Sequence, residues 1–263
     1  MVEGLYIAAS GGIRQQRKLE TISNNLANVS TQGFKKNILM YQERTPPFGD
    51  DFKMTQTPGL HTPYTNQINE VSYVEVTQSR TDFSQGPMVS SDNPMDLALN
   101  GEGFFVIKTP NGLRYTRNGT FHLDGLGQLV NHTGDLVMTH GGSGIIVPQN
   151  TERLSVDPDG TVFGGRGLEL VPLDQLKIMK FQNNNNLIKE GNGMFRSANG
   201  DRGQEATPNT QVIQGHIEKS NVNAVEEMTK LIETVRTLEA YQKIIQSIDE
   251  ADDQSVNSLA RVA

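Results

Sequence analysis

Apolar residues near the N-terminus recur at steps of three and four, the spacing of one face of an α-helix. The pattern covers residues 2–28, and charged side chains occupy other positions. Its first half uses alanine and glycine, so the face buries too little area to stabilise a helix alone. We therefore expect the helix to pack against a partner, through Leu5, Leu19, Ile22 and Leu26.

The helical pattern stops where Asn, Ser and Thr become frequent. Residues 28–33 favour side-chain to backbone hydrogen bonds, and Gly33 allows a positive φ, so the helix should break there. Phe34 then anchors the exit, and residues 34–75 are predicted to form an extended linker or arm. Four prolines block regular structure in that arm, namely Pro46, Pro47, Pro58 and Pro63.

Short β-type runs separated by turn residues fill the middle of the chain. The clearest pair is Phe104–Lys108 and Leu113–Arg117, joined through Asn111-Gly112, a strong hairpin signal. We predict an antiparallel β-rich domain, sheet or barrel, over residues 76–217. The other predicted strands are 120–123, 128–130, 136–138, 145–147, 154–156, 161–163, 176–181 and 194–197.

The last part of the chain, residues 218–263, returns to helical spacing. From Asn223 to Leu259 the apolar residues follow a near-heptad step, and a helix of this length spans roughly 55 Å. Ser220 or Asn221 is expected to cap its start. Its predicted contact residues are Met228, Leu231, Val235, Leu238, Ile245 and Ile248.

The long C-terminal helix has two possible roles. It could cover the chain's own sheet, or it could pack against other helices. Its length, its near-heptad period and the presence of a second, incomplete helix favour helix–helix packing. Charge agrees, because residues 1–44 carry six Lys/Arg against three Asp/Glu, whereas residues 216–263 carry five against nine. The two helices can pair within one chain, between chains, or both.

Composition excludes several classes of function. The net charge is -7 and no basic stripe is present, so nucleic acid is not an expected partner. Cysteine is absent, which removes disulfides and thiol chemistry. The N-terminus lacks the basic-then-apolar layout of a secretory signal, and no apolar run is long enough for a membrane span.

No group of residues predicts catalysis or metal binding. Asp157-Pro-Asp-Gly lacks the acidic ladder of a calcium loop, and Gly101-Glu-Gly does not open a helix as a phosphate loop would. We expect turns at both, and we expect no enzyme activity, no cofactor, no metal and no small-molecule substrate. The histidines are scattered without ligand spacing: His61, His122, His132, His140 and His216.

Three blocks of sequence resemble the flagellar basal-body rod proteins, a family that also includes hook proteins. They are SNNLANVSTQGFKK at 23–36, NPMDLALNGEGFFVIKTPNGLRYTRNGTFHLDGLGQLV at 93–130, and GHIEKSNVNAVEEMTKLIETVRTLEAYQKIIQS at 215–247. Residues 93–99 and 226–229 look more like the proximal than the distal rod subunits. The signature residues are Asn24, Asn25, Leu26, Ala27, Asn28, Gly33, Phe34, Ser220, Asn221, Val222 and Asn223.

This resemblance implies an α+β subunit in which long N- and C-terminal helices form a coiled-coil-like layer around which a central antiparallel β-rich domain lies. Residues 1–33 and 218–263 would then form the assembly core. The implied partners are copies of the chain, other rod proteins and the flagellar type III export apparatus. The implied location is the periplasmic rod, reached without cleavage of a signal. A distal rod subunit and a secreted β-domain binding module are the alternatives.

Overall fold

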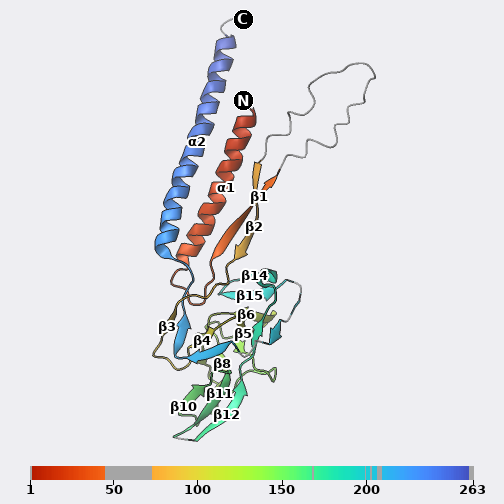
Figure 1. Cartoon of the computed structure of the whole chain (residues 1–263), viewed down its shortest axis with the longest axis vertical. Helices are drawn as coiled ribbons and strands as arrows, with labels where there is room; N and C mark the ends of the chain where they lie inside the picture. Colours follow the sequence, from red (N-terminus) through yellow and green to blue (C-terminus); the bar gives the residue numbers. More distant parts are fainter. Residues whose placement is uncertain are drawn as a thin grey trace, which may run out of the picture. The chain divides into compact units, whose positions relative to one another are not determined.

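The computed structural model describes residues 2–44, 73–167, 169–198, 200–201, 203–205 and 209–260. It shows an α+β chain with one helix near each end and a mostly antiparallel β-rich core between them (Figure 1), as the sequence predicts. The chain forms two compact units. Unit 1 comprises residues 1–26, 37–80 and 225–263, and unit 2 comprises residues 27–36 and 81–224.

Unit 1 contains the two helices and a small sheet. Helix α1 spans Val2–Ala27 and helix α2 spans Ala224–Ala260, each within one residue of the predicted bounds. Strands β1 (Asn37–Arg44) and β2 (Tyr73–Thr81) pair with each other. The proline-rich part of the predicted arm, residues 45–72, lies outside the described residues.

The predicted cap of the C-terminal helix is wrong. Ser220 Oγ accepts a hydrogen bond from the Val222 amide, and Asn221 Oδ1 accepts one from the Lys36 amide. Helix α2 begins only at Ala224, with Glu226 and Glu227 in its first turn, where acidic side chains favour the helix dipole. Ser220 and Asn221 therefore organise the segment that precedes the helix.

Unit 2 is built from short antiparallel strands in several sheets. The largest sheet has nine strands in the order β14-β15-β6-β5-β9-β8-β7, with β13 and β16 branching from β5. Strands β10, β11 and β12 form a second sheet, and the pairs β17-β4 and β18-β3 complete the unit.

The strand bounds are β3 Met88–Ser90, β4 Leu97–Asn100, β5 Phe104–Thr109, β6 Gly112–Thr116, β7 His122–Leu123, β8 Leu129–Val130, β9 Leu136–Val137, β10 Arg153–Val156, β11 Thr161–Arg166, β12 Glu169–Gln175, β13 Ile178–Lys180, β14 Leu187–Lys189, β15 Met194–Ser197, β16 Gln204–Glu205, β17 Gln211–Gln214 and β18 His216–Glu218. A short 3₁₀ helix, η1, covers Asn184–Asn186.

The predicted hairpin is confirmed, although its turn lies one residue earlier than expected. Thr109 pairs with Gly112, so Pro110 and Asn111 form the turn, and Gly112 takes the positive φ of 103°. Residues 145–147 do not form a strand, because Ile146 makes only an isolated bridge to Gln128. Strand β12 was not predicted, since Pro172 interrupts its β-type pattern.

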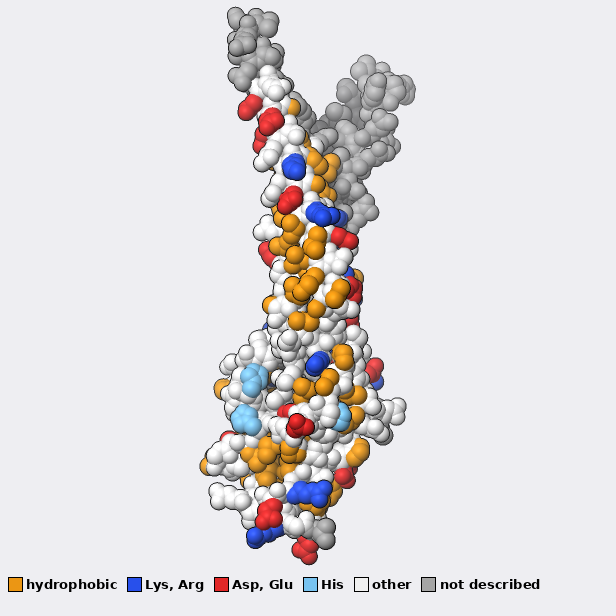
Figure 2. Space-filling view, turned by 90° about the vertical axis from the view of Figure 1, so that its left-hand side faces the viewer, with side chains coloured by type: hydrophobic (Ala, Val, Ile, Leu, Met, Phe, Trp, Pro, Cys, Tyr) orange, Lys and Arg blue, Asp and Glu red, His pale blue; other side chains and the backbone are white. Residues whose placement is uncertain are grey.

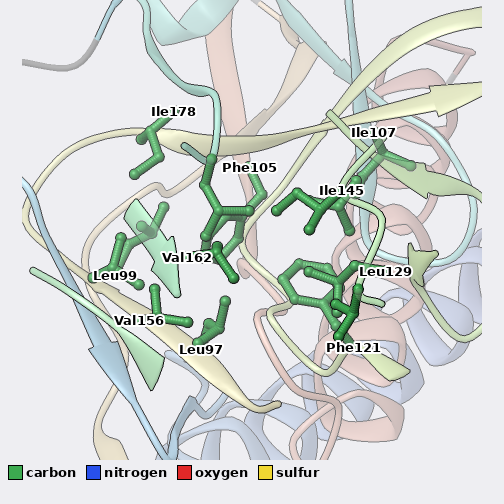
Figure 3. Close-up of a cluster of buried hydrophobic side chains, with 14 residues drawn as sticks. Leu97, Leu99, Phe105, Ile107, Phe121, Leu129, Ile145, Val156, Val162 and Ile178 are labelled. Atoms are coloured by element: carbon green, nitrogen blue, oxygen red, sulfur yellow. The ribbon is translucent and has the colours of Figure 1, made fainter. Parts of the chain in front are cut away.

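The core of unit 2 lies between its sheets. Phe105 and Phe121 meet edge to face with ring centroids 5.2 Å apart, at the centre of a buried aliphatic cluster (Figure 3). A second cluster gathers Phe104, Tyr115 and Phe195 on the other side of strands β5 and β6. Unit 2 thus has the large apolar core that an independently stable domain needs.

Candidate functional site: the helix pair and the signature segment

Helices α1 and α2 lie against each other in one antiparallel register (Figure 1). A Cβ placed on Gly4 would lie 3.9 Å from Ile248 Cδ1, and one on Gly11 would lie 2.5 Å from Tyr241 Cε1. Farther along, Asn25 Nδ2 donates to Glu227 Oε2 at 3.3 Å. Each advance of seven or fourteen residues in α1 matches an equal retreat in α2, so these contacts belong to a single register.

The face of α1 that meets α2 is made of small and polar residues. Ala8 and Ile22 are the only apolar side chains of unit 1, among those described, that are fully buried. The polar residues Gln15 and Asn25 are buried on α1, as Glu227 and Thr234 are on α2. Because little apolar area is buried, the pair gains its specificity from close approach and hydrogen bonds more than from hydrophobic stabilisation.

The predicted helix residues differ in exposure. Ile22 is 4% exposed, whereas Met228 is 51% exposed. The remaining predicted residues of this set are partly buried: Leu5, Leu19, Leu26, Leu231, Val235, Leu238, Ile245 and Ile248.

Helix α1 also contacts the first strand of unit 1. The Arg14 guanidinium lies over the Tyr41 ring, 5.4 Å from its centroid. The Asn25 side chain accepts from the Asn37 amide at 2.9 Å and donates to the Asn37 carbonyl at 3.0 Å. Asn25 therefore links α1, β1 and α2, which gives a structural role to the most buried asparagine of the signature.

In unit 2 the signature continues as a tight, buried segment. Gly33 has φ +65°, and a Cβ there would come within 2.5 Å of the Asn118 amide nitrogen. Its amide donates to the Glu218 carbonyl at 2.7 Å. Phe34 is 4% exposed, and its carbonyl accepts from the Asn221 amide at 3.4 Å. The two signature segments, 33–36 and 218–222, are therefore bonded directly to each other.

A buried ion cluster fastens these segments. Lys35 Nζ lies 2.5 Å from Glu218 Oε1 with both side chains fully buried, and Arg117 Nη1 lies 3.4 Å from Glu218 Oε2. Lys35 also donates to the Ser84 carbonyl at 2.7 Å, and the Gly86 amide donates to Glu218 Oε1 at 2.8 Å. One carboxylate thus joins four stretches of chain.

Burial shapes the electrostatics of this cluster. It lowers the pKa values of Lys35 and Arg117, and in both cases Glu218 opposes the shift. Lys189 donates to the Lys35 carbonyl at 2.8 Å and lies 3.4 Å from the centre of the Phe34 ring. Burial lowers the pKa of Lys189 to about 8.

The remaining signature residues surround these contacts. Ser220 and Val222 are buried, and Asn221 donates to the carbonyls of Asp82 and Ser84 at 2.9 and 3.1 Å. Asn28 Oδ1 accepts from the Thr31 hydroxyl, which closes the turn after α1. Asn24, Ala27 and Asn223 are exposed.

Sequence reasoning did not identify Lys35, Arg117 or Glu218. Their charges suggested solvent-exposed positions, because a charged side chain is rarely fully buried unless it is paired. The available signal was the placement of all three inside the family-like blocks, but nothing in the sequence pairs residues 35, 117 and 218.

The described residues contain no group of three or more His, Asp or Glu side chains that could hold a metal ion. Within the same part of the chain, neither helix is long and apolar enough to cross a membrane. The arrangement joins segments and presents helices, which is chemistry suited to holding subunits together.

Comparison with known proteins identifies similar families and relatives. Three family models match: the flagella basal body rod protein at residues 5–35, the flagellar hook protein FlgE/F/G D1 domain at 98–164, and the flagellar basal body rod FlgEFG protein C-terminal region at 213–259. The flagellar basal-body rod protein FlgF of Caulobacter vibrioides is 30% identical over 262 residues, covering 100% of both chains. FlgG of Buchnera aphidicola subsp. Acyrthosiphon pisum is 33% identical over 95% of this chain and 97% of the relative, and FlgG of Bacillus subtilis is 30% identical over 98% and 99%.

Proposed function

The chain belongs to the flagellar basal-body rod protein family, and on that premise we propose that it is a proximal rod subunit that polymerises through its terminal helices. As a member of this family it is a structural subunit of the basal body, where it assembles with other rod proteins. The distal rod position is the alternative, since relatives of both the FlgF and the FlgG type align along nearly the whole chain.

The observation that carries the proposal is the incomplete packing of the helix pair. Unit 2 has a large apolar core, whereas unit 1 buries only Ala8 and Ile22 among its described apolar side chains. A helix of 37 residues with so little apolar burial gains stability when further helices pack against it. We propose that α1 and α2 form a coiled-coil-like layer and that copies of the chain stack these layers into the wall of the rod.

The signature segments have a different role in this proposal. The Lys35–Glu218–Arg117 cluster holds the exit of α1 and the approach to α2 at one place on unit 2. We propose that residues 1–33 and 218–263 act as the assembly core, residues 34–75 as an arm towards a neighbour, and residues 76–217 as the β-rich body. Torque then passes through many moderate contacts, and the chain has no enzymatic activity.

The proposed route to the rod is export through the flagellar type III apparatus without cleavage of a signal, followed by assembly in the periplasm. The absence of cysteine suits folding in that compartment, because no thiol is present to oxidise.

Truncation tests the assembly role. Cells in which this chain is replaced by a form lacking residues 1–28 or 223–263 should yield basal bodies without the truncated chain, as measured by immunoblotting of isolated basal bodies. Normal incorporation of either form would overturn the proposal. Wall-hydrolase and glycan-binding assays on the full chain should both be negative.

Hydrogen exchange provides a second test on the full-length monomer. We expect amides of α1 and α2 to exchange faster than those of β5 and β6, because only unit 2 has a complete core. Equal protection of the two units in a proven monomer would argue against helices that are completed by assembly.

A further inference from the structure

Helix α2 carries an exposed apolar stripe on its first three turns. Val225 is 73% exposed, Met228 51% and Ile232 52%, and the half-buried Val235 continues the line. The residues follow one another at steps of three, four and three, so they form one ridge along the helix. Figure 2 shows hydrophobic side chains gathered over this part of α2.

The stripe is not the face that packs on α1. The register contacts place Glu227 and Tyr241 toward α1. At 100° per residue, Met228 lies about 100° around the helix from Glu227, and Val225 about 160°. The helix partner within the chain therefore leaves this ridge uncovered, while Glu239 and Lys243 replace apolar residues on the same face farther along.

We propose that this stripe is the docking surface for a second copy of the chain, an inference that rests on the proposed function and names the face used. Exposed apolar ridges at helical spacing mark surfaces that are covered by another protein. The same turns carry the exposed acids Glu226 and Glu233, whereas residues 1–44 carry three more basic than acidic side chains. The N-terminal part of unit 1 in a second copy therefore complements the stripe in charge.

The docked surface is strand β1 of that second copy. Ile38 and Met40 are 44% and 42% exposed, and alternate residues of a strand share one face. The opposite face of β1 carries Tyr41, on which Arg14 of the same chain stacks. Ile38 and Met40 thus form an apolar face that the α1 contact does not use.

Stripe and strand are different surfaces, so the contact is head to tail. A stripe that paired with itself would close a dimer, whereas a contact between two different surfaces leaves a free surface at each end and extends an assembly. This geometry is the one that a subunit of an axial structure requires.

Charge variants test the stripe. In cells in which Met228→Glu/Ile232→Glu replaces the chain, the amount in isolated basal bodies should fall at least about tenfold, since two charges would be desolvated at the contact. Met228→Leu/Ile232→Leu should incorporate within about twofold of the parent, because the apolar ridge is kept. Ile244→Glu, also exposed on α2 but off the stripe, is the matched control and should incorporate normally. Circular dichroism of each purified chain establishes that its helices form.

Cross-linking tests the pairing, and the cysteine-free chain gives it no background. Cells that co-express Met228→Cys and Met40→Cys chains should yield a disulfide-linked dimer of the two kinds in oxidised basal bodies. Dimers of Met228→Cys with itself would overturn the head-to-tail contact, and so would the absence of any cross-link.

The outcomes separate the two proposals. If the parent chain is incorporated, truncations are not, and the stripe variant is incorporated normally, the docking surface is wrong while the rod function stands. If the parent chain is itself absent from basal bodies, the proposed function fails.

Discussion

Gly11 and Tyr241 lie so close that a methyl group on Gly11 would come within 2.5 Å of ring carbon Cε1 of Tyr241. The adjacent Gly12 approaches the same tyrosine only at its Cβ, at 4.0 Å. The glycine at position 11 is therefore needed for close approach of α1 and α2, and two neighbouring glycines make opposite predictions.

Gly11→Ala should weaken the helix pair, whereas Gly12→Ala should strengthen α1 by up to about 1 kcal/mol, the usual gain from replacing a helical glycine. Hydrogen exchange of α1 amides in the full chain measures both changes. Combining Gly11→Ala with Tyr241→Leu should remove the difference between the two substitutions, because the ring that causes the clash is gone. An equal gain from both single substitutions would contradict the packing.

Neutralising Glu218 should strongly destabilise unit 2. Glu218→Gln leaves Lys35 and Arg117 buried without their carboxylate, and breaking a buried ion pair costs about 3–5 kcal/mol. Glu152→Gln, which removes the exposed partner of Arg166, should cost less than about 1 kcal/mol. Urea denaturation followed by near-UV circular dichroism compares the two. Lys35→Met should partly restore the Glu218→Gln chain, since it removes one unpaired charge.

Gly33 should tolerate no side chain. Gly33→Ala meets both a positive φ and the Asn118 backbone, whereas Gly134 has φ +83° with no atom within 4 Å of a Cβ. Gly134→Ala therefore measures the conformational cost alone, about 1 kcal/mol, and Gly33→Ala should exceed it clearly. Thermal unfolding of both variants gives the comparison, and equal midpoints would show that the signature segment can relax around the added methyl.

Lys189 should make stability depend on pH in the alkaline range. Its pKa falls to about 8 in the folded chain from an ordinary value of 10.5, so the unfolded chain binds more protons between these values. Stability should therefore rise from pH 8 to 10.5, and the penalty for burying the charged amine is present below pH 8. Lys189→Met should lack this component, while Lys35, Arg117 and Glu218 contribute equally to both chains. Parallel slopes of unfolding free energy against pH would contradict the assignment.

The two helices and their bounds were predictable because a helix is a local structure, and steps of three and four residues define its apolar face. The hairpin of β5 and β6 was predictable for the same reason, since its partners are adjacent in the sequence. Strands β4, β17 and β18 were not, because each pairs with a distant segment and carries no local signal: β17 with β4 and β18 with β3.

The sequence by itself determined the class of this protein: an α+β chain with two long helices, no thiols, and motifs of a structural family. Tertiary structure decided the register of α1 on α2, the burial of Lys35, Arg117 and Glu218 around one carboxylate, and the exposure of Met228 despite its apolar character. These features depend on which segments meet in space. Periodicity and composition carry no information about residues 35 and 218 being neighbours, since only packing brings them together.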